Sequence, residues 1–584
     1  MIETFDPVDA YDRRLAAGLG GELGALNRAG VLEASDVLVA QRLGRLGEED
    51  RCEVLVALAL VVKAARQGSV CVDLTQVPAL PQESGLSWPD HSTWLQQVGT
   101  SPLVAQGVLR IDSGLLYLDR YWTEEGAVVD DLRSRLAVNA PPVDRPRLSA
   151  ALSELFAGPT YSEQRLAAEE SACRWTSVIT GGPGTGKTTT LARLLAALVA
   201  ASDEPPRIAL AAPTGKAAAR MTQAIADAAA APDFPAHHRP ALEGLAASTL
   251  HRLLGTIPRQ ATRYRHDRHN RLPHDIVVVD ETSMVSITLM ARLIEAVRPD
   301  ARLVLVGDPD QLTSVEAGAV LQDLVAGLAG GADSPVSGLT RTFRFGDAIG
   351  ALAQAIRAGD QDQAWDLLTS GDDAVVLIDP GDLGAVRAAV EPTALALLHA
   401  AERGEQASAL AHLEAHRLLC AHREGPHGVG HWNRQIERWL LDRLGRDWFP
   451  SSYAGQPLIV NSNDYGLRLW NGDTGVVLAG GPASSGLQAV FADGTTGRPV
   501  NLTRLSDVTT AHAMTVHRSQ GSQFREVSVL LPPPESPTLT RELLYTAITR
   551  AQDRVRVIAT EESVRAAIAR PAQRATGLAA RLRP

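Results

Sequence analysis

Apolar and polar positions follow two different patterns along this chain, and the change falls near residue 145. Before it, apolar residues recur at helical spacing, as in residues 51–68 and 87–98. Residues 107–122 read as a short apolar hairpin, and the proline-rich residues 140–146 read as a linker. The pattern predicts a mainly helical N-terminal domain over residues 1–145.

After residue 148, short runs of β-branched and apolar residues alternate with helical stretches. The first series of runs is WTSVIT, PRIALAAPT, DIVVVDE and RLVLVGD, and the second is HRLLCAHR, QPLIVNSND, GVVLAG and EVSVLLP. Strands that alternate with helices form βαβ units around a mostly parallel sheet. The rest of the chain is therefore predicted to be α/β.

The segment ITGGPGTGKTTT lies between the run WTSVIT and an apolar helix, and it matches the phosphate-loop pattern G-x-x-x-x-G-K-[ST]. Glycines let backbone N–H groups turn toward phosphates at the positive end of a helix. Lys187 is expected to reach the β- and γ-phosphates and Thr188 to bind Mg²⁺. The expected nucleotide contacts are Gly182, Pro183, Gly184, Thr185, Gly186, Lys187, Thr188 and Thr189.

A second motif, DIVVVDETSMV, ends an apolar run in two acids. Asp280 would lie at the carboxyl end of a strand, where open α/β sheets bind ligands, and it suits Mg²⁺. Glu281 beside it suits polarising an attacking water. The two motifs together predict hydrolysis of a nucleoside triphosphate, with ATP and Mg²⁺ as cofactors.

Charge is unevenly distributed. Residues 1–145 carry 21 acids and 13 bases, a net of −8, whereas the whole chain carries −11. A polyanion site is therefore expected to be a local basic groove in the later part, while the N-terminal domain suits a protein partner. Of 56 basic residues only three are lysines, and two of these, Lys187 and Lys216, lie in motifs.

Several classes of protein are disfavoured by the sequence. The four cysteines are scattered and form no CxxC pair, which argues against a zinc site or a disulfide framework. No apolar run approaches a bilayer-spanning length, and the acidic start lacks the features of a signal peptide. We expect a cytoplasmic protein.

Further motifs surround the first two in a fixed order. They are APTGKAAARM, STLHRLLG, VGDPDQLTSVEAG, LTRTFRF, AMTVHRSQGSQF and LLYTAITRA. This set resembles the motifs of superfamily-one helicases of the 5′-to-3′ branch. Within that branch it is most similar to the RecD family, the alpha subunits of RecBCD complexes (exodeoxyribonuclease V).

The resemblance implies two RecA-like motor domains, residues 146–335 and 336–584. It also implies a strand-separating pin within residues 255–273 and a β-rich insertion at about 450–510. Trp470, in that insertion, would either stack a base or fill a small core, and the core is favoured.

The resemblance also assigns roles to single residues. Gln311 would sense the γ-phosphate, and Arg344 and Arg550 would act as arginine fingers from the second motor domain. Gln164 would read adenine, and Gln523 stands where the family often has an acid that contacts the sugar. The residues implied in DNA contact are Thr214, Gly215, Lys216, Thr249, His251, Thr515, His517 and Ser519. His251 and His517 could equally be core histidines.

The function implied is an ATP-dependent 5′-to-3′ DNA helicase, the motor subunit of a helicase-nuclease that acts on double-strand ends in recombination and repair. Its partners would be single-stranded DNA, duplex ends, and RecB-like and RecC-like subunits in a heterotrimer. The alternatives are a free-standing RecD-like helicase and a non-motor ATP-binding switch subunit. No nuclease site is expected, because the three lysines do not fit a D…(D/E)xK cluster.

Overall fold

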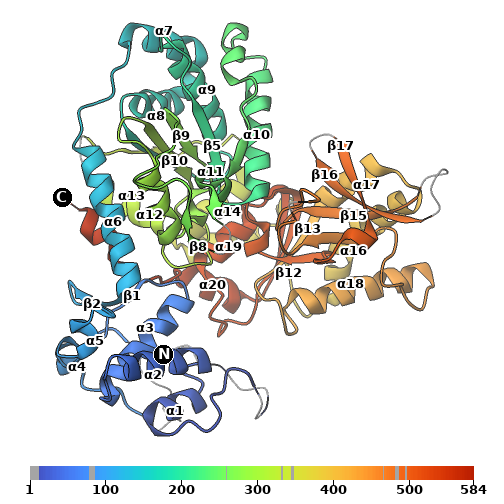
Figure 1. Ribbon diagram of the computed structural model, residues 1–584. Helices are drawn as coiled ribbons and strands as arrows, with labels where there is room; N and C mark the ends of the chain where they lie inside the picture. Colours follow the sequence, from blue (N-terminus) through green and yellow to red (C-terminus); the bar gives the residue numbers. More distant parts are fainter. Residues whose placement is uncertain are drawn as a thin grey trace.

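The computed structural model describes residues 5, 9, 12–77, 86–257, 260–330, 333–343, 347–464, 466–480, 486–493 and 496–583. Three units follow one another along the chain, and Figure 1 shows the N-terminal unit below the first motor unit and the second motor unit beside it. Within the described residues, no helix combines the length and the apolar character that crossing a membrane requires.

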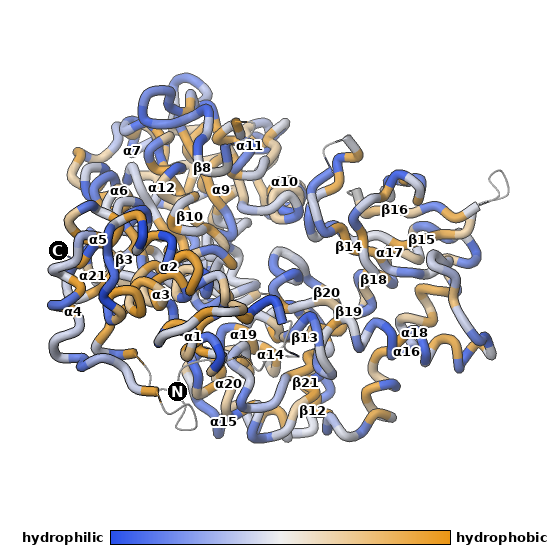
Figure 2. The backbone as a smooth tube through the Cα atoms, turned by 60° about the horizontal axis from the view of Figure 1, so that its bottom comes forward, coloured by the Kyte–Doolittle hydropathy of each residue, from blue (hydrophilic) through white to orange (hydrophobic). Residues whose placement is uncertain are grey.

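The N-terminal unit is mainly helical, as its pattern predicts. Its elements are α1 (Gly21–Arg28), α2 (Ala34–Leu46), α3 (Cys52–Arg66), β1 (Cys71–Val72), α4 (His91–Gly99), α5 (Pro102–Ala105), β2 (Leu109–Asp112), β3 (Leu115–Leu118) and α6 (Asp119–Leu136). Strands β2 and β3 pair antiparallel, so the expected hairpin forms. Hydrophobic residues concentrate along α2 and α3 (Figure 2), and Leu58 of α3 is fully buried.

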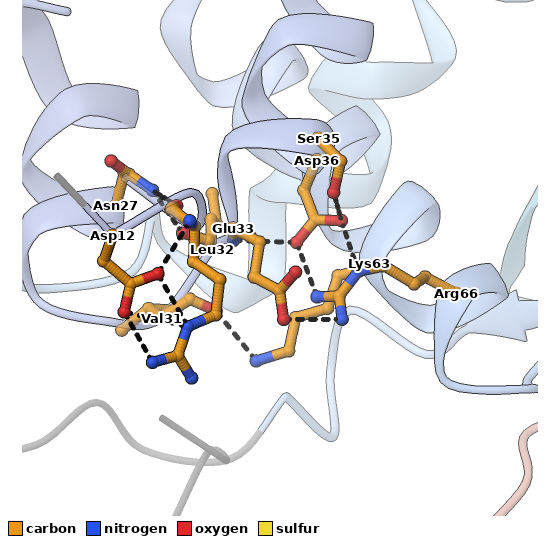
Figure 3. A network of polar contacts seen from close by, with 10 residues as sticks. Asp12, Asn27, Val31, Leu32, Glu33, Ser35, Asp36, Lys63 and Arg66 are labelled. Atoms are coloured by element: carbon orange, nitrogen blue, oxygen red, sulfur yellow. Dashed lines mark hydrogen bonds and ion pairs between the residues drawn. The ribbon is translucent and has the colours of Figure 1, made fainter. Parts of the chain in front are cut away.

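A polar network fastens α2 to α3 (Figure 3). Arg66 pairs with Asp36 at 2.9 Å and with Glu33 at 2.8 Å, at the start of α2. The buried Lys63 donates to the carbonyl oxygen of Val31 at 2.8 Å. A buried ammonium group needs hydrogen-bond acceptors, and this contact supplies one. The burial of Lys63 is therefore explained by a structural role.

The first motor unit is built on a six-stranded sheet with the order β11-β4-β10-β9-β5-β6, parallel throughout. Its strands are β4 (Thr176–Gly181), β5 (Ile208–Ala212), β6 (Ala247–Thr249), β9 (Ile276–Val279), β10 (Arg302–Gly307) and β11 (Val336–Leu339). Its helices are α7 (Arg145–Leu155), α8 (Ser162–Ala172), α9 (Lys187–Ala200), α10 (Gly215–Ala230), α11 (Leu250–Leu254), α12 (Ile287–Ala296) and α13 (Val320–Leu328). Helices cover both sheet faces, so the strands are buried on both sides and read as continuous apolar runs.

The second motor unit contains a five-stranded parallel sheet with the order β12-β21-β20-β13-β19. Its strands are β12 (Val375–Ile378), β13 (His416–Cys420), β19 (Ala513–Thr515), β20 (Phe524–Leu530) and β21 (Ala551–Ile558). Its helices are α14 (Asp347–Ala358), α15 (Gln361–Thr369), α16 (Leu383–Glu402), α17 (Gln406–Ala415), α18 (Val429–Leu444), α19 (Arg541–Ile548) and α20 (Glu561–Ala569). The α/β class with two parallel sheets is confirmed.

Both expected insertions take up β-structure. Within residues 255–273, β7 (Thr256–Ile257) and β8 (Gln260–Tyr264) form a two-stranded antiparallel sheet. The β-rich insertion is an antiparallel five-stranded sheet with the order β17-β16-β15-β14-β18. Its strands are β14 (Pro457–Val460), β15 (Thr474–Ala479), β16 (Leu487–Asp493), β17 (Thr496–Asn501) and β18 (Val508–Thr510). The runs QPLIVNSND and GVVLAG therefore belong to this insertion and not to the parallel sheet.

Tertiary packing differs from the expected domain boundaries in two places. Helix α6, expected in the N-terminal domain, packs against α12 of the first motor unit, and its Val128 and Leu132 share a core with Leu293. Strand β11 starts at Val336, where the second motor domain was expected to begin, yet it pairs with β4 of the first sheet. A local apolar pattern shows that an element has a buried face but not which unit covers it.

The C-terminal segment returns to the first motor unit. After α20, residues 570–583 lead to α21 (Leu578–Leu582), which packs against α13 and α6, and Figure 1 shows it beside α6. Arg574 donates to the carbonyl oxygen of Glu316 at 2.8 Å, and Val70 N–H donates to that of Ala575 at 2.9 Å. We call residues 570–583 the C-terminal strap, because they join all three units.

We expect Gly577→Ala to loosen the C-terminal strap. A Cβ at Gly577 would lie 2.0 Å from the hydroxyl of Tyr117 and 3.1 Å from Glu125 Oε2, and both side chains are buried. Overpacking of this kind costs about 1–3 kcal/mol. A thermal melt should show a lower midpoint for this variant, whereas Gly486→Ala, with open space around its Cβ, should melt like the parent. Equal melting of both variants would contradict the packing.

Candidate functional site

The phosphate loop forms between β4 and α9, as the motif predicts. Gly184 and Gly186 adopt positive φ angles of 83° and 81°, which glycine tolerates best. The Lys187 ammonium group lies back over the loop and donates to the carbonyl oxygens of Gly181 at 2.6 Å and Gly182 at 3.0 Å. The N-terminus of α9 faces the same loop and offers N–H groups to an anion.

The two acids follow β9, which is separated from β4 by β10 alone in the sheet. Burial, together with the neighbouring Glu281 charge, raises the pKa of Asp280 above its ordinary value. Glu281 has a φ of 50°, a left-handed conformation that is uncommon for a residue other than glycine and is found at strained functional positions. Two adjacent carboxylates at the end of a strand attract a cation, because its charge offsets the repulsion between them.

Arg550 reaches this site from the second motor unit. It is 2% exposed, and its Nη2 donates to Gln311 Oε1 of the first unit at 2.8 Å. Gln311 in turn donates through Nε2 to Asp308 Oδ2 at 3.0 Å. Burial lowers the pKa of Arg550, but an arginine remains charged. The structure therefore brings together Gln311 and Arg550, two residues assigned to one site.

A cavity of about 690 Å³ lies between the two motor units at this point. It contains most of the expected nucleotide residues. Those that line it are Pro183, Gly184, Gly186, Lys187, Thr188, Thr189, Asp280, Glu281, Gln311, Gln523 and Arg550. Gly182 and Thr185 belong to the same loop but are not part of the lining.

Two assigned residues stand apart from the rest. Gln164 is buried beside the phosphate loop, and its Nε2 donates to the carbonyl oxygen of Thr185 at 3.2 Å. Its Oε1 has no hydrogen-bond partner among the described residues, and its role toward adenine stays a prediction. Arg344 lies outside the described residues.

Sequence reasoning missed two side chains that line this cavity, Tyr161 and Arg220, and a third, Phe343, that packs against one of them. Tyr161 stacks with Phe343 at a ring separation of 6.2 Å, and the Phe343 N–H donates to the carbonyl oxygen of Gly184. Arg220 lines the cavity together with Tyr161. The signals were present, because Phe343 is part of LTRTFRF and Arg220 of APTGKAAARM.

A second cavity, of about 390 Å³, lies where DNA contact was expected. Gly215, Thr249 and His251 line it. The hydroxyls of Thr214 and Thr249 cap α10 and α11, so both helix N-termini are positioned at this cavity. His251 is exposed, so it is not a core histidine.

The expected DNA residues of the second unit are placed differently. Thr515 and Ser519 are buried, and Ser519 Oγ donates to the carbonyl oxygen of Val516 at 2.7 Å. His517 is half-buried at the start of the same short helical turn. None of the three lines the second cavity, and their roles in DNA contact stay predictions.

Trp470 corrects an expectation. It is half-buried and lines the second cavity instead of filling the core of the β-rich insertion, where Leu469 lies. A Cβ at Gly215 would lie only 2.4 Å from its Cγ, so the indole rests directly on the start of α10. The expectation failed because only the fold sets the insertion against the first motor unit.

Lys216 does not line the second cavity but follows Gly215 at the N-terminus of α10, and it gives DNA binding a testable pH dependence. Burial, with Arg417 nearby, lowers the pKa of Lys216 to about 8. The ammonium charge is present below that pH and lost above it, so affinity for single-stranded DNA should fall by about 10-fold from pH 7 to 9, the equivalent of one charge-assisted hydrogen bond. Fluorescence anisotropy should show this loss in the parent and a flatter profile for Lys216→Arg, which keeps its charge. Identical profiles would show that Lys216 does not contact the phosphates.

Three family models match separate parts of the chain. They are an AAA domain over residues 164–317, a UvrD-like helicase C-terminal domain over residues 510–558, and the N-terminal domain of RecBCD enzyme subunit RecD over residues 28–117. The first two contain the phosphate loop, Asp280, Glu281, Gln311 and Arg550, and the third lies in the N-terminal unit.

Whole-chain relatives carry the same names. The RecBCD enzyme subunit RecD of Mycolicibacterium smegmatis is 53% identical over 95% of this chain and 98% of its own length. That of Mycobacterium tuberculosis is 53% identical over 98% of both chains. The ATP-dependent RecD2 DNA helicase of Deinococcus radiodurans is 32% identical over 78% of this chain but only 56% of its own length. With 53% identity over nearly the whole length of both proteins, the chain belongs to the RecD family of RecBCD enzyme subunits.

Proposed function

We propose that this chain is an ATP-driven 5′-to-3′ DNA translocase and helicase, the motor subunit of a RecBCD-type helicase-nuclease. The observation that carries the proposal is the cavity between the motor units. One unit supplies the phosphate loop and two acids, and the other supplies a buried arginine. A site completed by two bodies couples nucleotide hydrolysis to their relative motion.

The residues divide the chemistry between them. The glycine-rich loop and Lys187 hold the phosphates, and Tyr161 and Phe343 offer aromatic faces for the base. The donor set of a threonine hydroxyl and a half-buried carboxylate fits Mg²⁺, so Thr188 and Asp280 would hold that ion, which neutralises phosphate charge when bound. Glu281 orients and deprotonates the attacking water. Arg550 stabilises charge that develops on the γ-phosphate, and Gln311 connects the phosphate to this arginine.

Hydrolysis drives movement because it frees the γ-phosphate, whose charge holds the two units together, to leave the site. With ATP bound, Arg550 is drawn toward the phosphate loop and the cleft closes. Release of phosphate lets the second unit move away. Helix α10 of the first unit and residues 515–519 of the second unit bind DNA alternately. The direction of movement and the strand-separating role of residues 255–273 rest on family membership.

The family comparison favours a complex over a free-standing enzyme. The two mycobacterial relatives named RecD match over 98% of their length, whereas RecD2 matches over 56% of its length. We therefore propose RecB-like and RecC-like partners, and we assign any nuclease activity of the complex to them. Single-stranded DNA and duplex ends would be the nucleic-acid substrates.

The test of the motor function is ATP hydrolysis by the purified chain with and without single-stranded oligonucleotides of different sequence. We expect strong stimulation by all of them, and binding that weakens steeply between about 50 and 200 mM salt, because phosphates carry the contact. An ATPase that DNA does not stimulate would favour the non-motor switch. A strong preference for one oligonucleotide would contradict a translocase.

The N-terminal unit presents a candidate docking surface for the partner subunits. On α2, Leu38 is 52% exposed and Leu46 is 63% exposed, in a unit whose excess of acids makes it unsuited to DNA. Leu38→Glu combined with Leu46→Glu should prevent co-purification with the partner subunits and keep the DNA-stimulated ATPase. Leu383→Glu, at an equally exposed leucine of α16, is the matched control. Normal assembly of the α2 variant would place the docking surface elsewhere.

A further inference from the structure

Helix α10 lines both cavities of the motor. Near its N-terminus, Gly215, Ala218 and Ala219 line the cavity where DNA contact is proposed. Arg220, on the next turn, lines the nucleotide cavity with Met221. A movement of this helix therefore changes the lining of both cavities at once.

Arg220 connects this helix to the second motor unit. Its Nη1 donates to the carbonyl oxygen of Gly521 at 3.1 Å, across 301 positions of sequence. Gly521 has a φ of 71°, and a Cβ built on it would lie 3.6 Å from the Cβ of Ala217, so the turn rests on α10. The contact thus joins the two units by both a hydrogen bond and close packing.

The turn that Arg220 holds is held from its own unit as well. Arg550 donates through Nη1 to the carbonyl oxygen of Ser522 at 3.3 Å, so two arginines, one from each unit, bind consecutive carbonyls. Gln520 extends the seam by donating to the carbonyl oxygen of Leu312 of the first unit at 2.7 Å. Gln523, which follows Ser522 in the chain, lines the nucleotide cavity.

The charge of Arg220 faces the two acids. Burial lowers the pKa of Arg220, and attraction from Glu281 and then Asp280 opposes that effect. Arg550 is attracted by Glu281 in the same way. Because a guanidinium group stays protonated, Arg220 is a fixed positive charge beside the residue proposed to activate water.

We propose that Arg220 is a positioning residue that couples DNA binding to ATP hydrolysis. This inference rests on the proposed function. DNA that contacts the N-terminus of α10 and the segment 515–519 draws together the two sides of the Arg220–Gly521 contact. Arg220 then keeps residues 521–523 close to Asp280 and Glu281. These residues support Arg550 beside the phosphates. Without Arg220, ATP and DNA still bind, but DNA no longer brings the second unit into the closed arrangement.

The experiment measures ATP hydrolysis by the full chain, with and without a poly-dT oligonucleotide, for Arg220→Ala, Arg220→Lys and Arg292→Ala. Arg292 pairs with Glu295 on its own helix and is the matched control. For Arg220→Ala we expect the DNA-stimulated kcat to fall on the order of 10²-fold, as for a site that is misaligned, with KM for ATP nearly unchanged. Arg220→Lys should recover part of the loss, because lysine keeps the charge but not the planar fork.

Binding measurements separate this role from its alternatives. Anisotropy with poly-dT and with a fluorescent ATP analogue should give parent-like affinities for Arg220→Ala. Full DNA stimulation in Arg220→Ala, or in Arg220→Lys should the alanine variant fail to fold, would overturn the role of Arg220. Loss of nucleotide affinity in proportion to kcat/KM would also overturn it, because Arg220 would then be a nucleotide ligand. A parent chain that DNA does not stimulate would contradict the proposed function itself.

Discussion

Lys187→Gln is expected to abolish DNA-stimulated ATP hydrolysis while the fold survives. In the structure the Lys187 ammonium group is held by the carbonyl oxygens of Gly181 and Gly182, at the place where it can turn to the β- and γ-phosphates. Loss of this charge should lower kcat on the order of 10²-fold or more, because a preorganised electrostatic contact to the transferring group is removed. A steady-state ATPase assay with saturating single-stranded DNA measures it.

The control for Lys187→Gln is Lys216→Gln. That change removes the lysine at the N-terminus of α10, so it should weaken DNA binding and raise the DNA concentration needed for half-maximal stimulation. Saturating DNA should restore much of its kcat. Thermal melting of both variants should match that of the parent, since Lys187 supports only a loop. Near-parental turnover by Lys187→Gln would remove the phosphate loop from the mechanism.

Glu281→Gln should bind ATP and single-stranded DNA and yet fail to turn over. Binding depends on the phosphate loop and on the acid at Asp280, whereas only the water step needs a carboxylate at residue 281. Removal of a general base typically costs 10²–10⁴-fold in rate, so we expect a fall of about that size. Single-turnover hydrolysis of bound ATP separates this chemical step from nucleotide binding.

Glu295→Gln provides the comparison for Glu281→Gln. Glu295 pairs with Arg292 on α12 of the same unit and is absent from the cavity lining. It should hydrolyse ATP at the parental rate. If a titration shows that Glu281→Gln has lost ATP binding while it melts normally, Glu281 is a ligand and not the base.

The sequence by itself determined the local chemistry. The phosphate loop, Asp280 and Glu281 could be predicted because a glycine-rich turn or a strand end is specified by neighbouring residues. The α/β class followed for the same reason, since strands buried on both faces read as apolar runs of similar length. The order of the remaining motifs identified the family, and with it the roles expected of Gln311 and Arg550 at the γ-phosphate.

Tertiary structure alone decided which distant segments meet. The contact of Arg220 with Gly521, the packing of Trp470 on Gly215 and the return of the C-terminal strap each join segments far apart in the chain. No local pattern encodes such a partner, because a buried face or a guanidinium group is satisfied by any matching surface. For that reason the sequence did not predict that α6 packs against the first motor unit. The sequence determined the chemistry of each side chain. The packing of the three units decided which other groups each side chain contacts.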